Sequence, residues 1–384
     1  MARFIAPASI EDYRTLAQQR LPRQFFDYLE GGAYAEQTCR ENITAFSQIH
    51  LRQRVLKDVS ERDLSATLLG QPFALPVVLG PVGLAGLNAR RGEVQAARAA
   101  KAAGVAFCES TVSLCSIEEV AATDAQLWFQ LYMLKDRGYA IELLQRAQRA
   151  GVDVLVFTVD LAVLGARYRD VRNGIAGSSG LRAKLSKVVD LLSHPQWLWD
   201  APIKGKPLVF GNLAAAVPNA KSLPAFKQWV DDQFDPSVTW DDLNWLREHW
   251  QGKIVLKGIL DPEDASIAAS IGFDAIAVSN HGGRQLDNVE ASIHALPRCV
   301  DAVAGRCEVL VDGGIRSGLD IVKALALGAN GCMLGRAWAY GLAAKGEQGV
   351  SEVLAILRAE MDVAMALTGC RSIAEITPDI LLRR

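Results

Sequence analysis

The sequence lacks a dominant charge, and it lacks any cysteine pattern. Its 41 basic and 43 acidic residues leave a formal charge of −2 over 384 residues. No strong field is available to attract nucleic acid, so we expect no nucleic-acid partner. The seven cysteines are scattered, without a CxxC pair or a Cys/His ligand spacing. They indicate buried, reduced thiols, and they predict neither a disulfide framework nor a bound metal.

Long uninterrupted hydrophobic runs are also missing. The first twenty residues reach Glu11 and Asp12 without an apolar core, which argues against a secretory signal and predicts a cytoplasmic chain. The stretch between Asp63 and Arg90 carries no charge and is long enough to span a bilayer, but three prolines and four glycines interrupt it. We therefore expect strands and turns there, and no transmembrane helix.

Short apolar runs alternate with amphipathic segments along most of the chain. Eight strand–helix repeats predict an α/β fold, a parallel (β/α)8 TIM barrel, over residues 77–337. We expect one domain, with an N-terminal helical extension over 1–76, a long insertion at about 172–220 after strand four, and a C-terminal helical segment over 338–384. The eight runs are "PVVLGP", "VAFCES", "LWFQLY", "VLVFTVD", "KIVLKG", "AIAVSN", "EVLVDG" and "GCMLGR".

Polar residues follow these runs at the point where each strand is expected to end. The stretch "SNHGGRQLD" at 279–287 follows the sixth run. In a parallel barrel the active site lies at the carboxyl ends of the strands. One polar strand end is explained by turn chemistry alone, but eight in register predict a site. The other strand ends carry Pro81 and Gly83, Ser110, Gln130 and Tyr132, Thr158 and Asp160, Lys257, Asp312 with Arg316, and Gly335 with Arg336.

The loops after the last two strands are rich in glycine. They read "VDGGIRSG" and "LGRAWAYG", and each supplies an arginine before a helix. Loops at these places are the usual phosphate site of the barrel, because backbone N–H groups and a helix N-terminus receive the anion. Ordinary βα turns are the alternative. No G-x-G-x-x-G follows an early strand, so a nicotinamide-binding unit is not supported, and a phosphorylated cofactor in the barrel mouth is predicted.

These motifs resemble one family. "SNHGGRQLD", "VDGGIRSGLDIVKALALGA", "WFQLYMLKDR", "FTVDLAVLGARYRD" and "KGILDPEDA" are similar to the FMN-dependent L-2-hydroxy acid dehydrogenases and oxidases, from about Tyr13 to Thr377. Within that family, "LEGGAYAEQT", "LRQRVLKDVS" and "LSHPQWLWD" look most like the bacterial membrane-associated L-lactate dehydrogenases. The resemblance implies FMN as cofactor, L-lactate oxidation to pyruvate as the activity, and a homotetramer.

The resemblance also implies roles for particular residues. His281 is expected to be the catalytic base and to pair with Asp160. Arg284 and Arg167 are expected to hold the substrate carboxylate, and Tyr28 and Tyr132 to contact substrate oxygens. The residues expected to contact FMN are Pro81, Val82, Gly83, Ser110, Gln130, Thr158, Lys257, Ser279, Asp312, Gly313, Gly314, Arg316, Gly335 and Arg336.

The chemistry requires such groups independently of the family. Oxidation of a 2-hydroxy acid removes two electrons and two protons, so a base with a pKa near neutrality is needed beside the flavin. Of the five histidines, His281 alone lies at a predicted strand end. An arginine fork fixes a carboxylate by two parallel hydrogen bonds. Lys257 is expected to stabilise negative charge on the reduced flavin. The order in which proton and electrons leave carbon is not readable from sequence.

Two further features bear on the electron acceptor. Plant glycolate oxidases have alanine and tryptophan where this chain has Gly83 and Val112; the first difference favours an acceptor other than oxygen, and the second leaves room for lactate or a larger acid such as mandelate. The insertion combines basic residues with two tryptophans, which is typical of a membrane interface, although an amphipathic helix packed on the barrel is an alternative. We expect peripheral attachment to the cytoplasmic face of the inner membrane and a membrane quinone as acceptor. A soluble oxidase that uses oxygen, and a flavin- or phosphate-binding barrel without turnover, are the rival interpretations.

Overall fold

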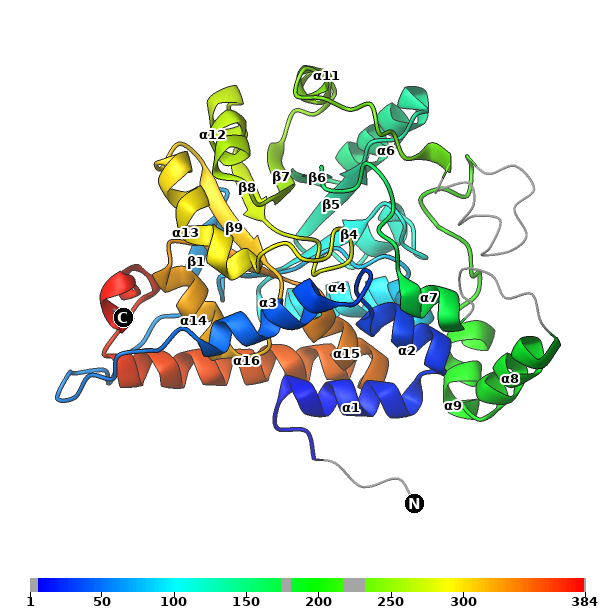
Figure 1. The fold of residues 1–384 in the computed structure, drawn as a ribbon, viewed down its shortest axis with the longest axis horizontal. Helices are drawn as coiled ribbons and strands as arrows, with labels where there is room; N and C mark the ends of the chain where they lie inside the picture. Colours follow the sequence, from blue (N-terminus) through cyan, green and yellow to red (C-terminus); the bar gives the residue numbers. More distant parts are fainter. Residues whose placement is uncertain (1–5, 174–180, 217–231, 383–384) are drawn as a thin grey trace.

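A closed parallel barrel forms the centre of the molecule (Figure 1). The computed structural model describes residues 6–173, 181–216 and 232–382. The strands pair in the order β10-β3-β4-β5-β6-β7-β8-β9, and each matches one of the eight apolar runs, so the predicted TIM barrel is confirmed. The strands are β3 (Val77–Leu79), β4 (Ala106–Ser110), β5 (Leu127–Tyr132), β6 (Val154–Thr158), β7 (Lys253–Ile259), β8 (Ala275–Val278), β9 (Glu308–Asp312) and β10 (Gly331–Leu334).

The strands are continuous apolar runs because helices cover their outer faces. Every residue of β3, β4, β6, β8 and β10 is buried, as expected for parallel strands with a packed barrel interior on the other face. Local signals set the helix bounds: α12 begins after the N-cap Asp261 with Pro262 in its first turn, and it ends at Gly272 in the left-handed region. The covering helices are α4 (Gly92–Ala103), α5 (Ile117–Ala121), α6 (Arg137–Arg149), α11 (Asp242–His249), α12 (Pro262–Ile271), α13 (Ser292–Val303), α14 (Gly318–Ala326) and α15 (Arg336–Lys345).

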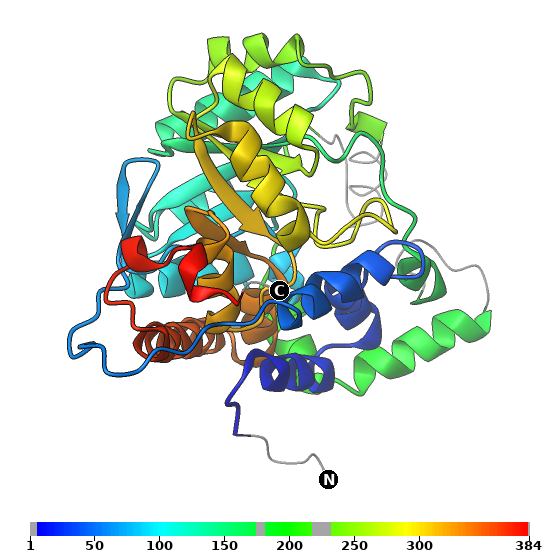
Figure 2. The same cartoon turned by 60° about the vertical axis from the view of Figure 1, so that its left-hand side comes forward.

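The N-terminal extension contains three helices and one hairpin. Helices α1 (Ile10–Arg20), α2 (Arg23–Glu30) and α3 (Gln37–Ser47) lie along one side of the barrel (Figures 1 and 2). The hairpin of β1 (Ala66–Leu68) and β2 (Gln71–Phe73) agrees with the strands and turns expected between Asp63 and Arg90, although the extension as a whole was expected to be helical. Its turn residues Leu69 and Gly70 both have positive φ, 52° and 79°, which is the backbone twist that a two-residue hairpin needs.

The C-terminal segment adds α16 (Glu347–Thr368), which packs along α15, α14 and α4. Helices α15 and α16 approach at Gly341 and Gly349: a Cβ on Gly349 would lie 2.0 Å from the carbonyl oxygen of Gly341. The backbones touch because neither position carries a side chain. Within the described ranges, no helix combines the length and the hydropathy needed to cross a membrane.

The insertion leaves the barrel after β6 and returns at β7. It contains α7 (Tyr168–Asn173), α8 (Leu181–Leu192), α9 (Pro195–Leu198) and the π-helix η2 (Trp199–Lys204). Helix α8 projects from the body of the molecule in two views (Figures 1 and 2). Trp197 fixes the base of the projection, because its Nε1 donates to the Leu87 carbonyl at 2.7 Å and its ring stacks on Phe25 at 4.7 Å. Residues 174–180 and 217–220 of the predicted insertion lie outside the described residues.

Candidate active site

A cavity of about 680 Å³ opens at the carboxyl ends of the strands. It collects residues that lie far apart in the sequence, as the strand-end argument predicted. Ser110, Gln130, Asp160 and Ser279 do not line it; they are held next to residues that do. The predicted site residues in the lining are Tyr28, Pro81, Val82, Gly83, Tyr132, Thr158, Arg167, Lys257, His281, Arg284, Asp312, Gly313, Gly314, Arg316, Gly335 and Arg336.

His281 and Asp160 form a pair at the edge of the cavity. The His281 Nδ1 lies 2.8 Å from the Asp160 Oδ1. An ionised carboxylate only accepts, so Nδ1 carries the proton and the Nε2 lone pair is left for a substrate. The absence of a side chain at Gly258 makes room for this pair, since a Cβ there would lie 2.6 Å from the carboxyl carbon of Asp160. The Tyr132 ring stacks near the imidazole, with 6.4 Å between centroids.

The surroundings keep His281 neutral. Burial lowers the pKa of His281 below its ordinary value, and the positive charges of Lys257 and Arg167 act in the same direction, while Asp160 opposes them. Burial alone would raise the pKa of Asp160, yet His281 and Lys257 hold that pKa below its ordinary value. An uncharged imidazole beside an ionised carboxylate is the resting state that a general base requires.

Lys257 connects this pair to the other side of the barrel. Its Nζ lies 2.9 Å from the Asp312 Oδ2 and donates to the Ser279 hydroxyl at 2.9 Å. Burial opposes the ammonium charge, but Asp312 and Asp160 outweigh burial and raise the pKa of Lys257. The site therefore contains a permanent positive charge that points into the cavity from the centre of the barrel.

The loop that carries His281 has an unusual backbone. His281, Gly282 and Gly283 have φ of 57°, 63° and 73°, all in the left-handed region. Histidine rarely adopts this region, so the surrounding structure must hold the loop in place. A reciprocal pair of amide hydrogen bonds does so: Asn42 and Asn280 each donate to the other at 2.8 Å. The Asn280 oxygen also accepts from the Gly283 N–H at 3.1 Å.

Asn42 and Asn280 were not singled out in the sequence. Asn280 lies inside the motif around His281, so its position was a signal. Asn42 gave no signal, because it lies 238 residues away on α3 and only the fold brings the two amides together.

Two arginines meet the C-terminal end of α2. Arg284 Nη1 donates to the carbonyls of Tyr28 and Gly31 at 2.9 and 2.8 Å. Arg336 donates to the carbonyls of Leu29, Gly31 and Gly282. Cations are favoured there because helix C-terminal carbonyls carry partial negative charge. The Nε and Nη2 groups of Arg284 make no hydrogen bond to the described part of the chain, so they remain available for a substrate carboxylate.

Burial lowers the pKa of Arg284 to about 10, and the charge of Arg167 beside it adds to this effect. Arg167 approaches through Nε, 3.5 Å from the Arg284 carbonyl oxygen. The positive charge of Arg167 disfavours the charged form of the buried Arg284 guanidinium. A bound carboxylate relieves the repulsion, so the pair favours an anionic substrate.

The far side of the cavity suits a phosphate and a polar chain. Helix α15 begins at Gly335 with no side-chain cap, so its first N–H groups are available to an anion. Helix α14 is different, because Ser317 and Asp320 already cap it. Asp312 Oδ1 is buried without a hydrogen-bond partner among the described residues, as expected where a ligand hydroxyl completes the site. Arg316 lines the cavity here, whereas Arg336 is committed to carbonyls. These residues fit FMN.

Comparisons with known proteins agree with this geometry. Residues 17–383 match the family model described as FMN-dependent dehydrogenase. The chain is 54% identical over 373 residues to an L-lactate dehydrogenase of Ectopseudomonas mendocina (strain ymp), covering 97% of this chain and 98% of that protein. It is also 54% identical over 378 residues to an L-lactate dehydrogenase of Caulobacter vibrioides (strain NA1000 / CB15N), covering 98% of each. Among solved structures, the monotopic membrane protein (S)-mandelate dehydrogenase matches with a TM-score of 0.92 and 40% identity, over 99% of this chain and 100% of that one.

The Asp160 carboxylate should set the acidic limit of activity. Asp160 raises the pKa of His281 against the effect of burial. In Asp160→Asn the pKa of His281 therefore falls further, and the acidic limb of kcat/KM moves to lower pH. The maximal rate should fall on the order of 10²- to 10⁴-fold, because the imidazolium loses its counter-ion. A pH profile of both enzymes checks this, and an acidic limb that stays in place would refute the coupling.

The Asn42 amide should position His281. Asn42→Ala leaves the buried Asn280 amide short of a partner, so the free energy of unfolding should fall by about 1–3 kcal/mol and kcat should fall while FMN stays bound. Thr38→Val is the matched control: Thr38 also joins α3 to the segment after His281, by two hydrogen bonds to Val289, but farther from the imidazole. If both variants lose the same free energy of unfolding and both keep the wild-type kcat, Asn42 has only a structural role. Denaturant unfolding and steady-state kinetics measure the two effects.

Proposed function

This chain belongs to the family of FMN-dependent dehydrogenases, and we propose that it oxidises L-lactate to pyruvate and passes the electrons to a membrane quinone. It is an FMN-dependent oxidoreductase of the (β/α)8 class. The observation that carries the proposal is the neutral His281, paired with Asp160 and facing the same cavity as Arg284 and Arg167. The names of the relatives at 54% identity support lactate as the substrate.

The residues of the chain divide the reaction between them. Arg284 and Arg167 bind the substrate carboxylate, which orients the hydroxyl-bearing carbon. His281 accepts one proton at Nε2, and Asp160 stabilises the imidazolium that forms. The buried ammonium of Lys257 favours negative charge at the centre of the barrel. When bound, FMN would accept the two electrons. The residues expected from the sequence would hold it, with Arg316 and the start of α15 at its phosphate.

A larger 2-hydroxy acid is the second candidate substrate. The structural match to an (S)-mandelate dehydrogenase favours it. Val112 and Gly83 bound the substrate end of the cavity, and a Cβ on Gly83 would lie 2.7 Å from the Val112 Cγ2. A side chain at position 83 would therefore clash with Val112, so glycine is required for this contact between the two loops. The ratio of kcat/KM for L-lactate to that for (S)-mandelate decides between them.

Helix α8 supports attachment to a membrane, because its amphipathic pattern is reversed. The face that carries Lys187, Asp190 and Leu191 points to the protein: the Asp190 Oδ2 accepts from the Arg23 N–H at 2.9 Å, and Leu191 packs against the core. The outward face is apolar and between 50% and 67% exposed. A helix that meets only water shows the opposite arrangement. Among the described side chains of α8, which begin at Leu185, the exposed apolar ones are Leu185, Val188, Val189 and Leu192.

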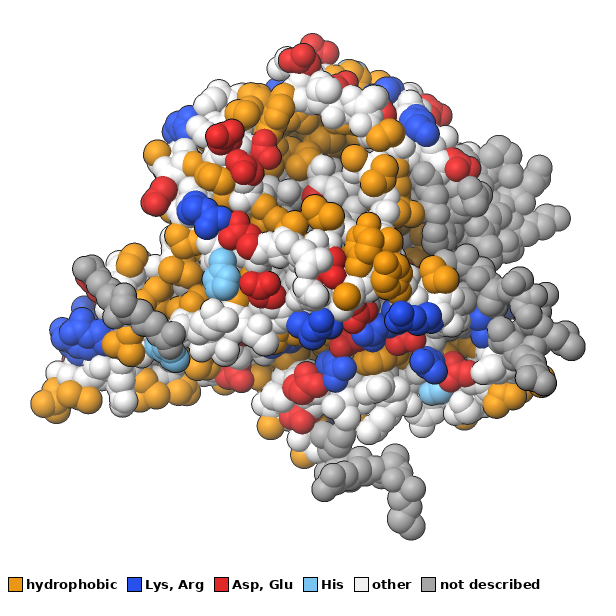
Figure 3. Space-filling view, viewed as in Figure 1, with side chains coloured by type: hydrophobic (Ala, Val, Ile, Leu, Met, Phe, Trp, Pro, Cys, Tyr) orange, Lys and Arg blue, Asp and Glu red, His pale blue; other side chains and the backbone are white. Residues whose placement is uncertain are grey.

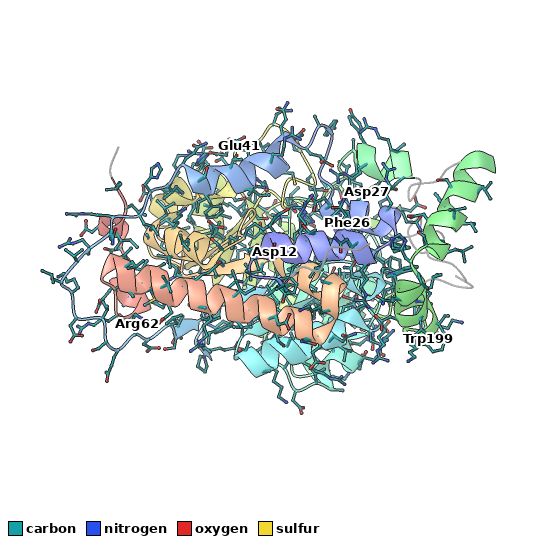
Figure 4. All side chains as sticks on the ribbon, turned by 90° about the horizontal axis from the view of Figure 1, so that it is seen from below. Asp12, Phe26, Asp27, Glu41, Arg62 and Trp199 are labelled. Carbon is teal, nitrogen blue, oxygen red and sulfur yellow. The ribbon has the colours of Figure 1, made fainter. Side chains whose placement is uncertain are left out.

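The segment after α8 continues this surface. Trp199 and Ile203 are more than half exposed, and the Lys204 ammonium lies 5.0 Å from the Trp199 ring. Figure 4 shows Trp199 at the outer edge of the molecule, at the opposite end from Arg62. Exposed tryptophan beside lysine suits the boundary between lipid head groups and acyl chains. We therefore propose peripheral attachment through α8 and η2; a homotetramer stays a prediction.

Anaerobic bleaching should test the substrate. Addition of L-lactate should remove the visible absorbance of bound FMN, and D-lactate should not.

Two variants should separate the base from the carboxylate clamp. His281→Gln should keep FMN but slow bleaching by about 10²- to 10⁴-fold. Arg284→Lys should raise KM as well as lower kcat, because the fork that grips the carboxylate is lost. Wild-type protein that no 2-hydroxy acid bleaches would disprove the proposed reaction. If the enzyme forms hydrogen peroxide in air as fast as it reduces a quinone, oxygen is an equally good acceptor, and the interpretation as a soluble oxidase is favoured.

Replacement of the apolar α8 face should release the enzyme from membranes. Leu185, Val188, Val189 and Leu192 are changed to serine together, which removes about 1.5–3 kcal/mol of transfer free energy for each side chain that the membrane buries fully. Co-sedimentation with anionic vesicles should fall at low salt, while bleaching by L-lactate stays unchanged. Leu56→Ser is the control, because Leu56 is fully exposed but lies outside α8, in the segment between α3 and β1. Unchanged co-sedimentation of the fourfold variant would contradict the attachment site.

A further inference from the structure

The cavity extends beyond the ring of residues assigned to substrate and FMN. Its additional part is lined from outside the barrel, by the N-terminal extension, the loop after η1 (Ala85–Leu87) and the insertion. We call this part the outer arm. Its lining includes Phe25, Leu87, Asn88, Val171, Lys187 and Phe210. None of these residues has a role in the proposed oxidation of lactate.

The outer arm is mostly apolar, and besides Lys187 it contains one amide without a hydrogen bond among the described residues. Leu87 and Phe210 are 5% and 4% exposed, and Phe25 is partly buried against the core. Asn88 is only 5% exposed, yet its side-chain amide makes no hydrogen bond to the described part of the chain. The Asn88 amide therefore faces the space of the cavity, and its donors are free to meet a ligand. An amide in this state that lines a cavity indicates a ligand with a hydrogen-bonding group between apolar surfaces.

The outer arm ends at the helix that we propose to lie on the membrane. Lys187 lines the arm from the inward face of α8, and the opposite face of the same helix is the exposed apolar face. Val171 lines the arm and is also 62% exposed, so the arm reaches the surface of the molecule there. Figure 3 shows hydrophobic side chains above a row of lysine and arginine on the face of the molecule that it presents. An apolar molecule can thus reach the cavity from the lipid side.

The wall of the outer arm is fixed rather than loose. Trp197 stacks on Phe25 and bonds to the Leu87 carbonyl, so two lining residues are held by one buried indole of the insertion. Arg20 and Arg90 both approach Asp200, at 2.7 and 3.6 Å, just after α9. The insertion is therefore attached to the extension and to the barrel on both sides of the arm, which keeps the arm open between them.

We propose that the outer arm binds the head group of a lipophilic quinone. The Asn88 amide donates a hydrogen bond to a quinone carbonyl, Phe25, Leu87 and Phe210 contact the ring, and the isoprenoid tail leaves past Val171 toward the bilayer. This inference rests on the proposed function, and it adds the place where the acceptor binds. The overall reaction balances, because the two electrons and two protons that leave L-lactate convert the quinone to the quinol.

The test separates the two halves of the reaction by anaerobic stopped-flow spectroscopy. Asn88→Leu removes the donor and keeps the volume, and Val171→Trp narrows the arm at an exposed position that tolerates bulk. Reoxidation of the reduced flavin by a long-chain ubiquinone in vesicles should slow about tenfold or more in both variants, as expected for a lost hydrogen bond or a blocked path. Reoxidation by ferricyanide, a small water-soluble acceptor, should be unchanged. Asn244→Leu, at an exposed position of α11, is the matched control.

The outcomes distinguish the inference from the proposed function. Dithionite can reduce the flavin, so quinone reoxidation is measurable even if L-lactate fails to bleach the enzyme, and such a failure overturns only the proposed substrate. Unchanged quinone reoxidation in both variants overturns the outer arm as the acceptor site. Slower reduction by (S)-mandelate with normal quinone reoxidation shows that the arm holds a bulky substrate instead, which also overturns the inference. Photolabelling of the wild type by an azidoquinone should fall in Asn88→Leu, as a readout independent of turnover.

Discussion

The site depends on a set of charges buried at the centre of the barrel. Asp160, Lys257 and Asp312 come from the ends of β6, β7 and β9, and Lys257 pairs with Asp312 while it also attracts Asp160. Removal of one member of such a set leaves an uncompensated buried charge, which costs about 3–5 kcal/mol. Lys257 also lowers the pKa of His281, and Asp160 accepts the hydrogen bond of its imidazole. Stability and chemistry are therefore set by the same four residues, and the strand order of the barrel places them together.

The N-terminal extension completes this site. The end of α2 supplies the carbonyls that hold Arg284 and Arg336, and α3 supplies the amide that holds the loop around His281. In most barrels the loops after the strands carry the specificity. Here residues before the first barrel strand hold Arg284 and the loop that carries His281.

The barrel could be predicted because its strands and helices have local sequence patterns. Contacts between residues that are far apart in the sequence could not be predicted. Buried parallel strands are continuous apolar runs, so all eight were recognisable, and polar residues after them marked the rim. The Asn42–Asn280 pair was not recognisable because periodicity carries no information about contacts 238 residues apart. The composition of α8 suggested a membrane interface, but only the contacts of Asp190 and Leu191 show that its apolar face points outward. Arg336 was predicted to contact the ribityl chain or phosphate of FMN, which stays a prediction; it lines the cavity, and its side chain donates to carbonyls of α2 and of the His281 loop.

The reversed polarity of α8 also constrains the choice of electron acceptor. An exposed apolar face on a water-soluble oxidase promotes aggregation and has no compensating benefit. On a membrane enzyme the same face holds the cavity close to acceptors that are concentrated in the bilayer, so that binding of the acceptor approaches an intramolecular event. In the proposed reaction, Arg284 and Arg167 bind the anionic substrate, and the outer arm is the proposed path of a lipophilic acceptor. Under that proposal the parts of the cavity that serve the two half-reactions differ in polarity, because the arginines line one part and Phe25, Leu87 and Phe210 line the other.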